Sequence, residues 1–261
     1  MASDRYPDRG VTGDRYTSRE LMVSAAAAEI DDGDVVFVGM RLPLIAFQVA
    51  VSTHAPNAMA IYESGVVRDD PADGFIHTMC DLPNQNRAVA TTGMLDIMAR
   101  LQRGDVDVGF LGGAAIDRYG NLDTTWVRDG DREIRLPGSG GACDIACLAG
   151  RTVLVMPHEP RRFVERVPYV TSPGYDPDGE GATRAAPGGG PSALVTSKAT
   201  FGFDDRGELR LESVHPGERV DDVLAALPWE VKTVADVTTT PAPTDEELEL
   251  IRRFDPEGFW T

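Results

Sequence analysis

Short runs of uninterrupted apolar residues recur along the chain and alternate with longer stretches that have a helical repeat. Runs that are apolar at nearly every position, rather than at every second one, are typical of strands in a sheet covered on both faces. The alternation with helices predicts an α/β fold with a mainly parallel sheet that helices cover on both faces. The predicted strands are GDVVFVG (33–39), AMAIYE (58–63), VDVGFLGG (106–113), RTVLVM (151–156), SALVTSKATFGF (192–203) and ELRLESVHPG (208–217).

Two of the predicted helices begin with the same capping signal. Thr17 and Glu20 form a capping box at the start of TSRELMVSAAAAEI, and Thr244 and Glu247 repeat it at the start of TDEELELIRRFDP. In this motif the threonine accepts from the N–H three residues on, while the glutamate accepts from the threonine N–H. The second signal predicts a closing helix near the end of the sequence.

Proline and glycine indicate the ends of two further helices. We expect a helix over 41–55, since proline is tolerated in a first helical turn and Pro43 falls there. Gly104 follows TTGMLDIMARLQRG as a candidate C-cap.

The length and composition predict one large domain. A chain of 261 residues with 42% apolar residues has enough material for a proper core. We expect a polar, flexible leader over 1–16 and a single domain over 17–261. The Gly-, Pro- and Asp-rich stretch 173–191 predicts a long surface loop rather than a linker, because strand-like sequence resumes directly after it.

The net charge is strongly negative. The chain has 25 basic against 42 acidic residues, a formal charge of −17, and its only lysines are Lys198 and Lys232. Nucleic acid is therefore not an expected partner, since phosphate contacts need clustered Lys and Arg. Two interpretations of the acidic surface stay open: adaptation to high salt, as in a halophilic source, and an ordinary acidic protein.

The sequence gives no sign of a membrane, a secretory signal or a metal. No apolar run approaches the ~20 residues that a membrane span needs, and the N-terminus is polar and acidic, so we expect a cytoplasmic protein. Three cysteines, Cys80, Cys143 and Cys147, are too few for a disulfide framework. The C-x3-C pair has no histidine nearby, and we interpret it as packing on a helix. Four scattered histidines predict no metal site.

Candidate chemistry begins at the end of the second predicted strand. Glu63 ends AMAIYE and is followed by Ser64 and Gly65, whose small size would let a substrate approach the carboxylate. Ligands of open α/β sheets bind at the carboxyl ends of the strands. The glycine pair Gly112-Gly113 follows another strand and is expected at the same edge.

Two loops add to this site. In LPGSGGACDIACLAG the glycines Gly138, Gly140 and Gly141 lead into a short helix that starts near Ala142. Free N–H groups at such a junction suit an anion or a developing oxyanion, and a nucleotide phosphate stays an alternative, although no P-loop or G-x-G-x-x-G motif is present. The turn DRYGN presents the side chain of Asn121.

These segments together resemble one known family. YESGVV, GGAAIDRYGNLDTT, LPGSGGACDIA and VERVPYVTSPGY occur in the order and spacing typical of the β subunit of class I coenzyme A transferases, of the glutaconate CoA-transferase type. RLESVHPG and the closing PTDEELELIRRFDP add to the similarity, which extends from about residue 18 to the closing helix. The resemblance implies the CoA-transferase (NagB/RpiA-like) fold.

The resemblance also implies a mechanism. The glutamate, here Glu63, attacks the thioester carbonyl of an acyl-CoA, and an enzyme-bound glutamyl-CoA thioester follows. Gly140 or Gly141 would supply an oxyanion N–H, with Gly138 and Asn121 close by. Many members have Glu-Asn-Gly where this chain has Glu63-Ser64-Gly65. The difference concerns the side chain next to the nucleophile and not the nucleophile itself.

The family implies a second, α subunit, without which this chain would be inactive, and a hetero-oligomer. Coenzyme A thioesters enter as substrates, and no tightly bound cofactor is expected. Related ring-cleaving CoA-thioester hydrolases share the DRYGN segment but lack this glutamate, so Glu63 favours the transferase. A hydrolase subunit and a non-catalytic small-ligand binding protein remain the alternatives. The acyl group stays open among glutaconate, a 3-oxoacid and a steroid or aromatic breakdown acid.

Overall fold

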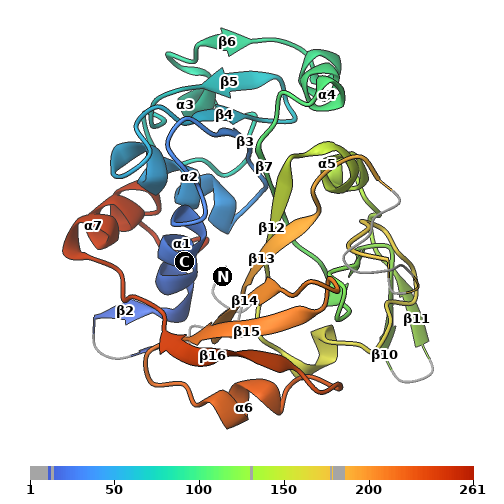
Figure 1. Cartoon of the computed structure of the whole chain (residues 1–261). Helices are drawn as coiled ribbons and strands as arrows, with labels where there is room; N and C mark the ends of the chain where they lie inside the picture. The colour runs from blue at the N-terminus through green and yellow to red at the C-terminus, as the bar shows by residue number, and fades with distance from the viewer. Residues whose placement is uncertain (1–10, 13–14, 130–131, 177, 179–185) are drawn as a thin grey trace.

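The computed structural model describes residues 11–12, 15–129, 132–176, 178 and 186–261. Within these residues the largest sheet has ten strands, in the order β16-β15-β14-β13-β12-β7-β3-β4-β5-β6 (Figure 1). Its strands are β3 (Val35–Phe37), β4 (Met59–Ile61), β5 (Val66–Arg68), β6 (Ala90–Thr91), β7 (Val108–Leu111), β12 (Arg151–Val155), β13 (Pro191–Val195), β14 (Ala199–Phe203), β15 (Leu209–Val214) and β16 (Lys232–Thr239).

The direction of the strands changes from the centre of the sheet to its ends. The central strands β13, β12, β7, β3 and β4 all run parallel. Towards one end β5 and β6 are antiparallel to their neighbours. Towards the other, β14 and β15 are antiparallel, and β16 pairs with β15 in parallel. The prediction of a mainly parallel sheet is confirmed.

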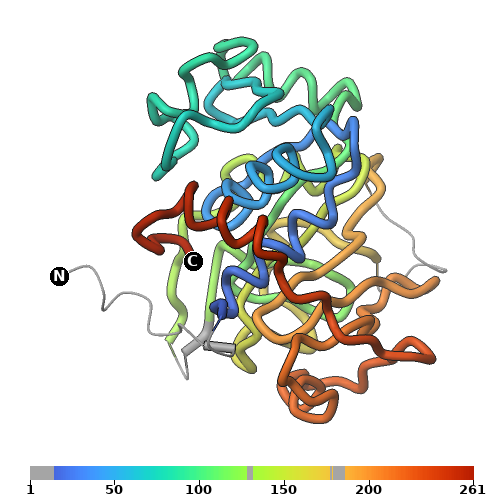
Figure 2. Tube along the Cα trace, turned by 90° about the vertical axis from the view of Figure 1, so that its left-hand side faces the viewer, coloured from blue at the N-terminus to red at the C-terminus, as the bar shows by residue number. Residues whose placement is uncertain are grey.

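Helices cover both faces of this sheet. Figure 1 shows α1, α2 and α7 on one side and α4 and α5 on the other, and in Figure 2 the red C-terminal part of the chain lies against the blue helices α1 and α2. The helices are α1 (Ser18–Ala27), α2 (Leu42–Ser52), α3 (Leu82–Gln85), α4 (Met94–Arg103), α5 (Ala142–Leu148), α6 (Val220–Leu224) and α7 (Asp245–Phe254), with a 3-10 turn at Pro160–Arg162.

Two buried apolar clusters lie on opposite faces of the sheet. Successive strand residues point to opposite faces, and accordingly Val36 joins the cluster under α1, α2 and α7 while Phe37 joins the one under α4 and α5. The same alternation separates Val195 from Leu194. This is why the strands are apolar at consecutive positions.

The predicted capping signals are confirmed. Thr17 with Glu20 and Thr244 with Glu247 both form complete capping boxes, at the first turns of α1 and α7. Gly104 is the left-handed C-cap of α4, with a φ of 82°. The helix predicted over 41–55 is α2, with its proline in the first turn.

The single strand predicted over 192–203 is wrong. The segment forms two antiparallel strands, β13 and β14, joined by a tight turn. In this turn the Thr196 N–H donates to the carbonyl of Ala199 at 2.9 Å, and the Thr196 hydroxyl accepts from the Ala199 N–H at 3.0 Å. A threonine side chain closes the turn, so the glycine or proline that usually indicates one is missing.

Smaller sheets and loops complete the chain. Of the predicted leader 1–16, residues 1–10 and 13–14 lie outside the described residues, and so do 177 and 179–185 of the predicted surface loop. The two-stranded sheets, which the sequence analysis did not predict, are β1 (Val11–Thr12) with β2 (Tyr16–Thr17), β8 (Ala115–Ile116) with β9 (Leu122–Asp123), and β10 (Trp126–Asp129) with β11 (Arg132–Arg135).

Candidate active site

Glu63 occupies the centre of a tight turn between the antiparallel strands β4 and β5. The Gly65 N–H donates to the Tyr62 carbonyl at 2.8 Å, and the Tyr62 N–H donates to the Val66 carbonyl at 2.9 Å. Gly65 has a φ of +107°, and a Cβ there would lie 2.1 Å from the carbonyl oxygen of Thr92. Only glycine fits this position, which explains why the apolar strand leads into Glu-Ser-Gly.

Ser64 ties this turn to the loop that follows β5. Its hydroxyl donates to the Met79 carbonyl at 3.2 Å, and the Asn84 side-chain amide donates to the same oxygen at 2.8 Å. The turn that carries Glu63 is therefore held from both its strands and its neighbouring loop.

A buried arginine fixes the rest of that loop. Arg68 is fully buried and donates to the carbonyl oxygens of Asp70, Pro71, Asn84 and Asn86. Its guanidinium also pairs with the Asp70 carboxylate at 2.8 Å. A buried charge needs such partners. These hydrogen bonds therefore fix the backbone path of the loop around the guanidinium.

The predicted glycine loop is held by Thr124. The Gly138 N–H donates to the Thr124 carbonyl at 3.0 Å, and the Thr124 hydroxyl donates to the Gly138 carbonyl at 2.9 Å. Gly138 and Gly140 both have positive φ angles, of 98° and 52°. Among the described residues, none accepts a hydrogen bond from the N–H of Gly140 or Gly141. Both donors therefore remain for a ligand.

The glycine loop meets the Glu63 turn. A Cβ on Gly141 would lie 3.2 Å from both the Cδ and the Oε1 of Glu63, and 2.7 Å from the Met98 methyl group. The N-cap of α5 and the carboxylate are thus neighbours in space. These two segments are far apart in the sequence, and the sheet brings them together.

A cavity of about 750 Å³ includes this contact. It lies where ligands of α/β proteins bind, at the carboxyl ends of the parallel strands. The residues just beyond the strands line it: Val38 and Gly39 after β3, Glu63 after β4, Gly112 and Gly113 after β7, Met156 and Pro157 after β12, and Ser197 after β13. Gly140 and Gly141 line it as well, whereas Gly138, Asn121, Ser64 and Gly65 do not.

Asn121 lies in a buried hydrogen-bond network beside this cavity. Its amide donates to both oxygens of Asp117 at 3.2 Å, and its carbonyl oxygen accepts from the Gly174 N–H at 2.8 Å. Burial raises the pKa of the Asp117 carboxyl, although the hydrogen bonds that this carboxyl accepts act to lower it. The network locks the DRYGN turn onto residues 173–175. The side chain of Asn121 therefore stabilises this turn and does not line the cavity.

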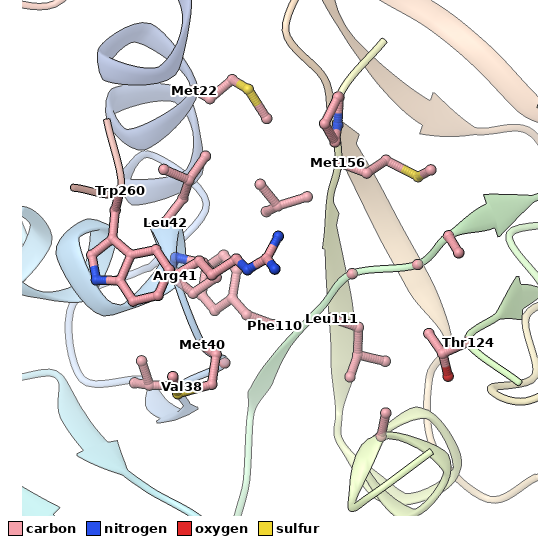
Figure 3. Close-up of a pocket in the computed structure, with 18 of the residues that line it drawn as sticks. Met22, Val38, Met40, Arg41, Leu42, Phe110, Leu111, Thr124, Met156 and Trp260 are labelled. Carbon is pink, nitrogen blue, oxygen red and sulfur yellow. The ribbon is translucent and has the colours of Figure 1, made fainter. Parts of the chain in front are cut away.

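Sequence reasoning missed several cavity residues. Figure 3 shows Arg41, Leu42, Phe110, Met22 and Trp260 around one part of the cavity. No sequence motif indicates them, because they come from separate segments that only the fold brings together.

Three further charged residues that line the cavity, Glu159, Arg161 and Arg162, pair with one another. Glu159 accepts from Arg161 at 2.7 Å and from Arg162 at 2.9 Å. In the part of the chain that the structure describes, no group of three or more His, Cys, Asp or Glu is arranged to hold a metal ion. Nor does any described helix combine the length and apolar character needed to cross a membrane.

Comparison with known proteins supports one family. The profile of the coenzyme A transferase family matches residues 19–226. The chain is 34% identical over 250 residues to the β subunit of the 3-oxoadipate CoA-transferase of Pseudomonas knackmussii, covering 92% of this chain and 94% of that one.

The glutaconate CoA-transferase of Acidaminococcus fermentans is similar in both sequence and structure. Its β subunit is 34% identical over 256 residues, covering 92% of this chain and 93% of that one. The crystal structure of this enzyme superposes with a TM-score of 0.84 at 31% identity, over 95% of this chain and 98% of that one.

A hydrolase is a more distant relative. The cholesterol ring-cleaving hydrolase IpdB subunit of Mycobacterium tuberculosis is 28% identical, over 93% of this chain and 97% of that one. With the family profile and both transferase subunits in agreement, this chain belongs to the coenzyme A transferase family and corresponds to the β subunit of its two-subunit members.

Proposed function

We propose that this chain is the β subunit of a two-subunit CoA transferase and that Glu63 is its nucleophile. The contact between the Glu63 carboxylate and Gly141 is the observation that carries the proposal. It puts a carboxylate beside two unused backbone donors in one cavity. A nucleophile beside an oxyanion site is what acyl transfer needs.

The reaction runs through two enzyme-bound species. A Glu63 carboxylate oxygen attacks the thioester carbon, the C–S bond breaks, and CoA leaves as a thiolate from an acyl-glutamyl anhydride. The thiolate then attacks the Glu63 carbonyl, which releases the first acid and leaves a glutamyl-CoA thioester. A second carboxylate reverses both steps and departs as the new thioester. Every step exchanges one acyl bond for another, and no water is consumed.

The N–H groups of Gly140 and Gly141 would stabilise the tetrahedral intermediates. Backbone donors at a fixed position need no reorganisation as charge develops, and losing one such donor typically costs on the order of 10²–10³ in rate. Gly138 and Thr124 hold the loop in place, while Ser64 and Gly65 hold the turn. Asn121 supports the site from behind the cavity wall.

The partner is an α subunit of the same family. The cavity is open on the side of Met40, Arg41 and Phe259, which are exposed in this chain alone. A thioester intermediate needs protection from water, and covering this opening is a role for the partner. Neither a tightly bound cofactor nor a metal takes part in the proposed reaction.

The test uses this chain coexpressed with its α subunit. Incubation with acyl-CoA followed by borohydride reduction or hydroxylamine trapping should label the peptide that contains Glu63, and only in the presence of the partner. Glu63→Gln should abolish both the label and CoA transfer. Glu159→Gln is the matched control, since it removes a second carboxylate of the same cavity while leaving Glu63 in place.

Other outcomes identify the alternatives. A hydrolase would release free CoA without an acceptor acid and would retain activity in Glu63→Gln. A binding protein would give neither label nor turnover. Either result contradicts the transferase.

A further inference from the structure

The glycine loop, residues 136–141, is attached to the rest of the chain at one point close to the cavity. The Gly138 N–H donates to the Thr124 carbonyl, and the Thr124 hydroxyl donates back to the Gly138 carbonyl. Thr124 also lines the cavity, and Figure 3 shows it on the cavity wall. The positions of the Gly140 and Gly141 N–H groups therefore depend on where Thr124 lies.

Thr124 is itself held by a threonine from a distant segment. Its N–H donates to the hydroxyl oxygen of Thr171 at 3.0 Å. The Thr171 hydroxyl also lies 2.8 Å from the Thr125 hydroxyl, and it donates to the Asp123 carboxylate at 3.4 Å. A hydroxyl has one proton to donate, so Thr125 is the donor in its bond with Thr171. One hydroxyl thus contacts three consecutive residues, and the middle one holds the glycine loop.

The surroundings of this hydroxyl are buried and well ordered by hydrogen bonds. Asp123 is fully buried, and its carboxylate accepts from the N–H groups of Thr125, Trp126 and Tyr169 at 2.7, 2.9 and 3.1 Å. Within the described part of the chain no Lys, Arg or His forms an ion pair with this carboxylate, so these donors balance its charge. The segments on either side of Thr171 and Thr124 are therefore fixed relative to each other.

We propose that Thr171 is a positioning residue for the oxyanion site: its hydroxyl fixes Thr124, which in turn fixes the glycine loop and the two N–H groups that it offers to the developing charge. This rests on the proposed function. Thr171 does not line the cavity, and it makes no hydrogen bond to the turn that carries Glu63. It acts on the reaction only through the loop, because backbone donors stabilise a transition state only from a fixed position.

Kinetics of the chain coexpressed with its α subunit test this assignment. Succinyl-CoA, glutaryl-CoA and butyryl-CoA serve as donors with acetate as acceptor, and the best donor of the wild type is used for every variant. Thr171→Val removes the hydroxyl and keeps the shape of the side chain. It should lower kcat by about 10²-fold, the usual cost of misplacing a group at the reacting centre by about 1 Å. The KM should change by about threefold or less, since only the transition state loses a contact.

Two conservative variants and one control separate positioning from folding. Thr171→Ser keeps the hydroxyl and should retain kcat to within about threefold of the wild type. Thr171→Cys puts a weakly accepting thiol at the same place, so its kcat should fall between those of the serine and valine variants. Thr240→Val is the matched control. It also removes a buried threonine hydroxyl, which lies 2.9 Å from the Nδ1 of His215 and outside the cavity, and it should keep the kcat of the wild type.

Hydrogen–deuterium exchange of the same complexes gives a readout that does not depend on turnover. Exchange of a hydrogen-bonded amide reports the local opening of its segment. Peptides that cover residues 136–141 should exchange faster in Thr171→Val than in the wild type. Peptides that cover Glu63 should exchange at the same rate in both, and Thr240→Val should change neither.

Three results would overturn the assignment. The first is a wild-type kcat in Thr171→Val, or in Thr171→Cys where the valine variant does not fold. The second is a raised KM at unchanged kcat, and the third is unchanged exchange of the glycine loop. In each case labelling of Glu63 persists, so the proposed function stands. Absence of transfer and of label in the wild type with every donor would instead overturn the proposed function itself.

Discussion

The carboxylate of Glu63 lies against Gly141, so closely that a Cβ on the glycine would be 3.2 Å from both the Cδ and the Oε1 of the glutamate. Glu63 lies in the turn between β4 and β5, and Gly141 is the N-cap of α5. Their contact makes the position of the carboxylate dependent on the absence of a side chain at position 141.

Gly141→Ala should therefore reduce CoA transfer while the protein stays folded. The added methyl group would displace the Glu63 carboxylate or the Met98 side chain, and misplacing a reacting group by about 1 Å costs on the order of 10²-fold in rate. Steady-state kinetics and a thermal melt of the same variant measure the two effects. Gly74→Ala, where a Cβ meets nothing within 4 Å, is the control. Unchanged kinetics in Gly141→Ala would contradict the proposed geometry.

Gly65→Ala should destabilise the chain strongly. The variant combines a positive φ with a Cβ at 2.1 Å from the Thr92 carbonyl oxygen, and we expect a loss of about 3 kcal/mol or more in the free energy of unfolding. Gly33 has a similar φ of +93° but open space around it, so Gly33→Ala should cost only about 1 kcal/mol. Urea unfolding measures the loss in the free energy of unfolding of both variants, and the difference between them is the cost of the clash with Thr92. Equal losses in the two variants would contradict this clash.

Arg41→Gly should stabilise the isolated chain. The φ and ψ angles of Arg41 are 72° and −125°, which glycine adopts without strain. The expected gain is about 1 kcal/mol in the free energy of unfolding. Arg41→Ala removes the same side chain but retains the Cβ, so it should bring no such gain. Chemical denaturation measures the free energy of unfolding of both variants. An Arg41→Ala variant that is as stable as Arg41→Gly would contradict the proposed backbone strain.

Lowering the pH should destabilise the fold through His215. This imidazole is fully buried between the Thr240 hydroxyl and the Thr196 carbonyl, at 2.9 and 2.8 Å. Burial lowers its pKa to about 4. In the unfolded chain His215 binds a proton below its ordinary pKa of about 6.5, whereas in the folded chain it stays neutral down to the lower pKa. Its contribution to the free energy of unfolding is therefore fully present above about pH 6.5 and is lost as the pH falls. The loss approaches about 3 kcal/mol near the folded pKa.

The variant His215→Asn removes this titration. Between pH 7 and 4.5 its free energy of unfolding should fall less steeply than that of the wild type. Burial also lowers the pKa of His158, which both proteins contain. Parallel pH profiles would exclude His215 as a source of the acid sensitivity.

Local signals predicted much of the fold. The two capping boxes lie where Thr17, Glu20, Thr244 and Glu247 indicate them, because these contacts form within one helical turn. The edge of the sheet that holds the cavity was also predictable, since Glu63 and the glycine pair after β7 both follow parallel strands.

The remainder depends on tertiary contacts that no local pattern contains. Thr196 closes a hairpin in which the usual turn residues are missing, so the boundary between β13 and β14 is hidden. The direction of the Asn121 side chain depends on its bond to Gly174, which only the fold brings near, as well as on its bond to Asp117 within the same turn. The angles of Arg41 depend on how β3 passes into α2.

The hairpin that carries Glu63 has one further consequence. Both of its arms are hydrogen-bonded into the sheet, and the turn itself is only as long as the two residues between Tyr62 and Gly65. The carboxylate consequently has no backbone hinge of its own with which to swing toward or away from a bound thioester. In the proposed reaction, any opening and closing during turnover then falls to the surrounding segments or to the partner chain, while the backbone that carries Glu63 keeps its position.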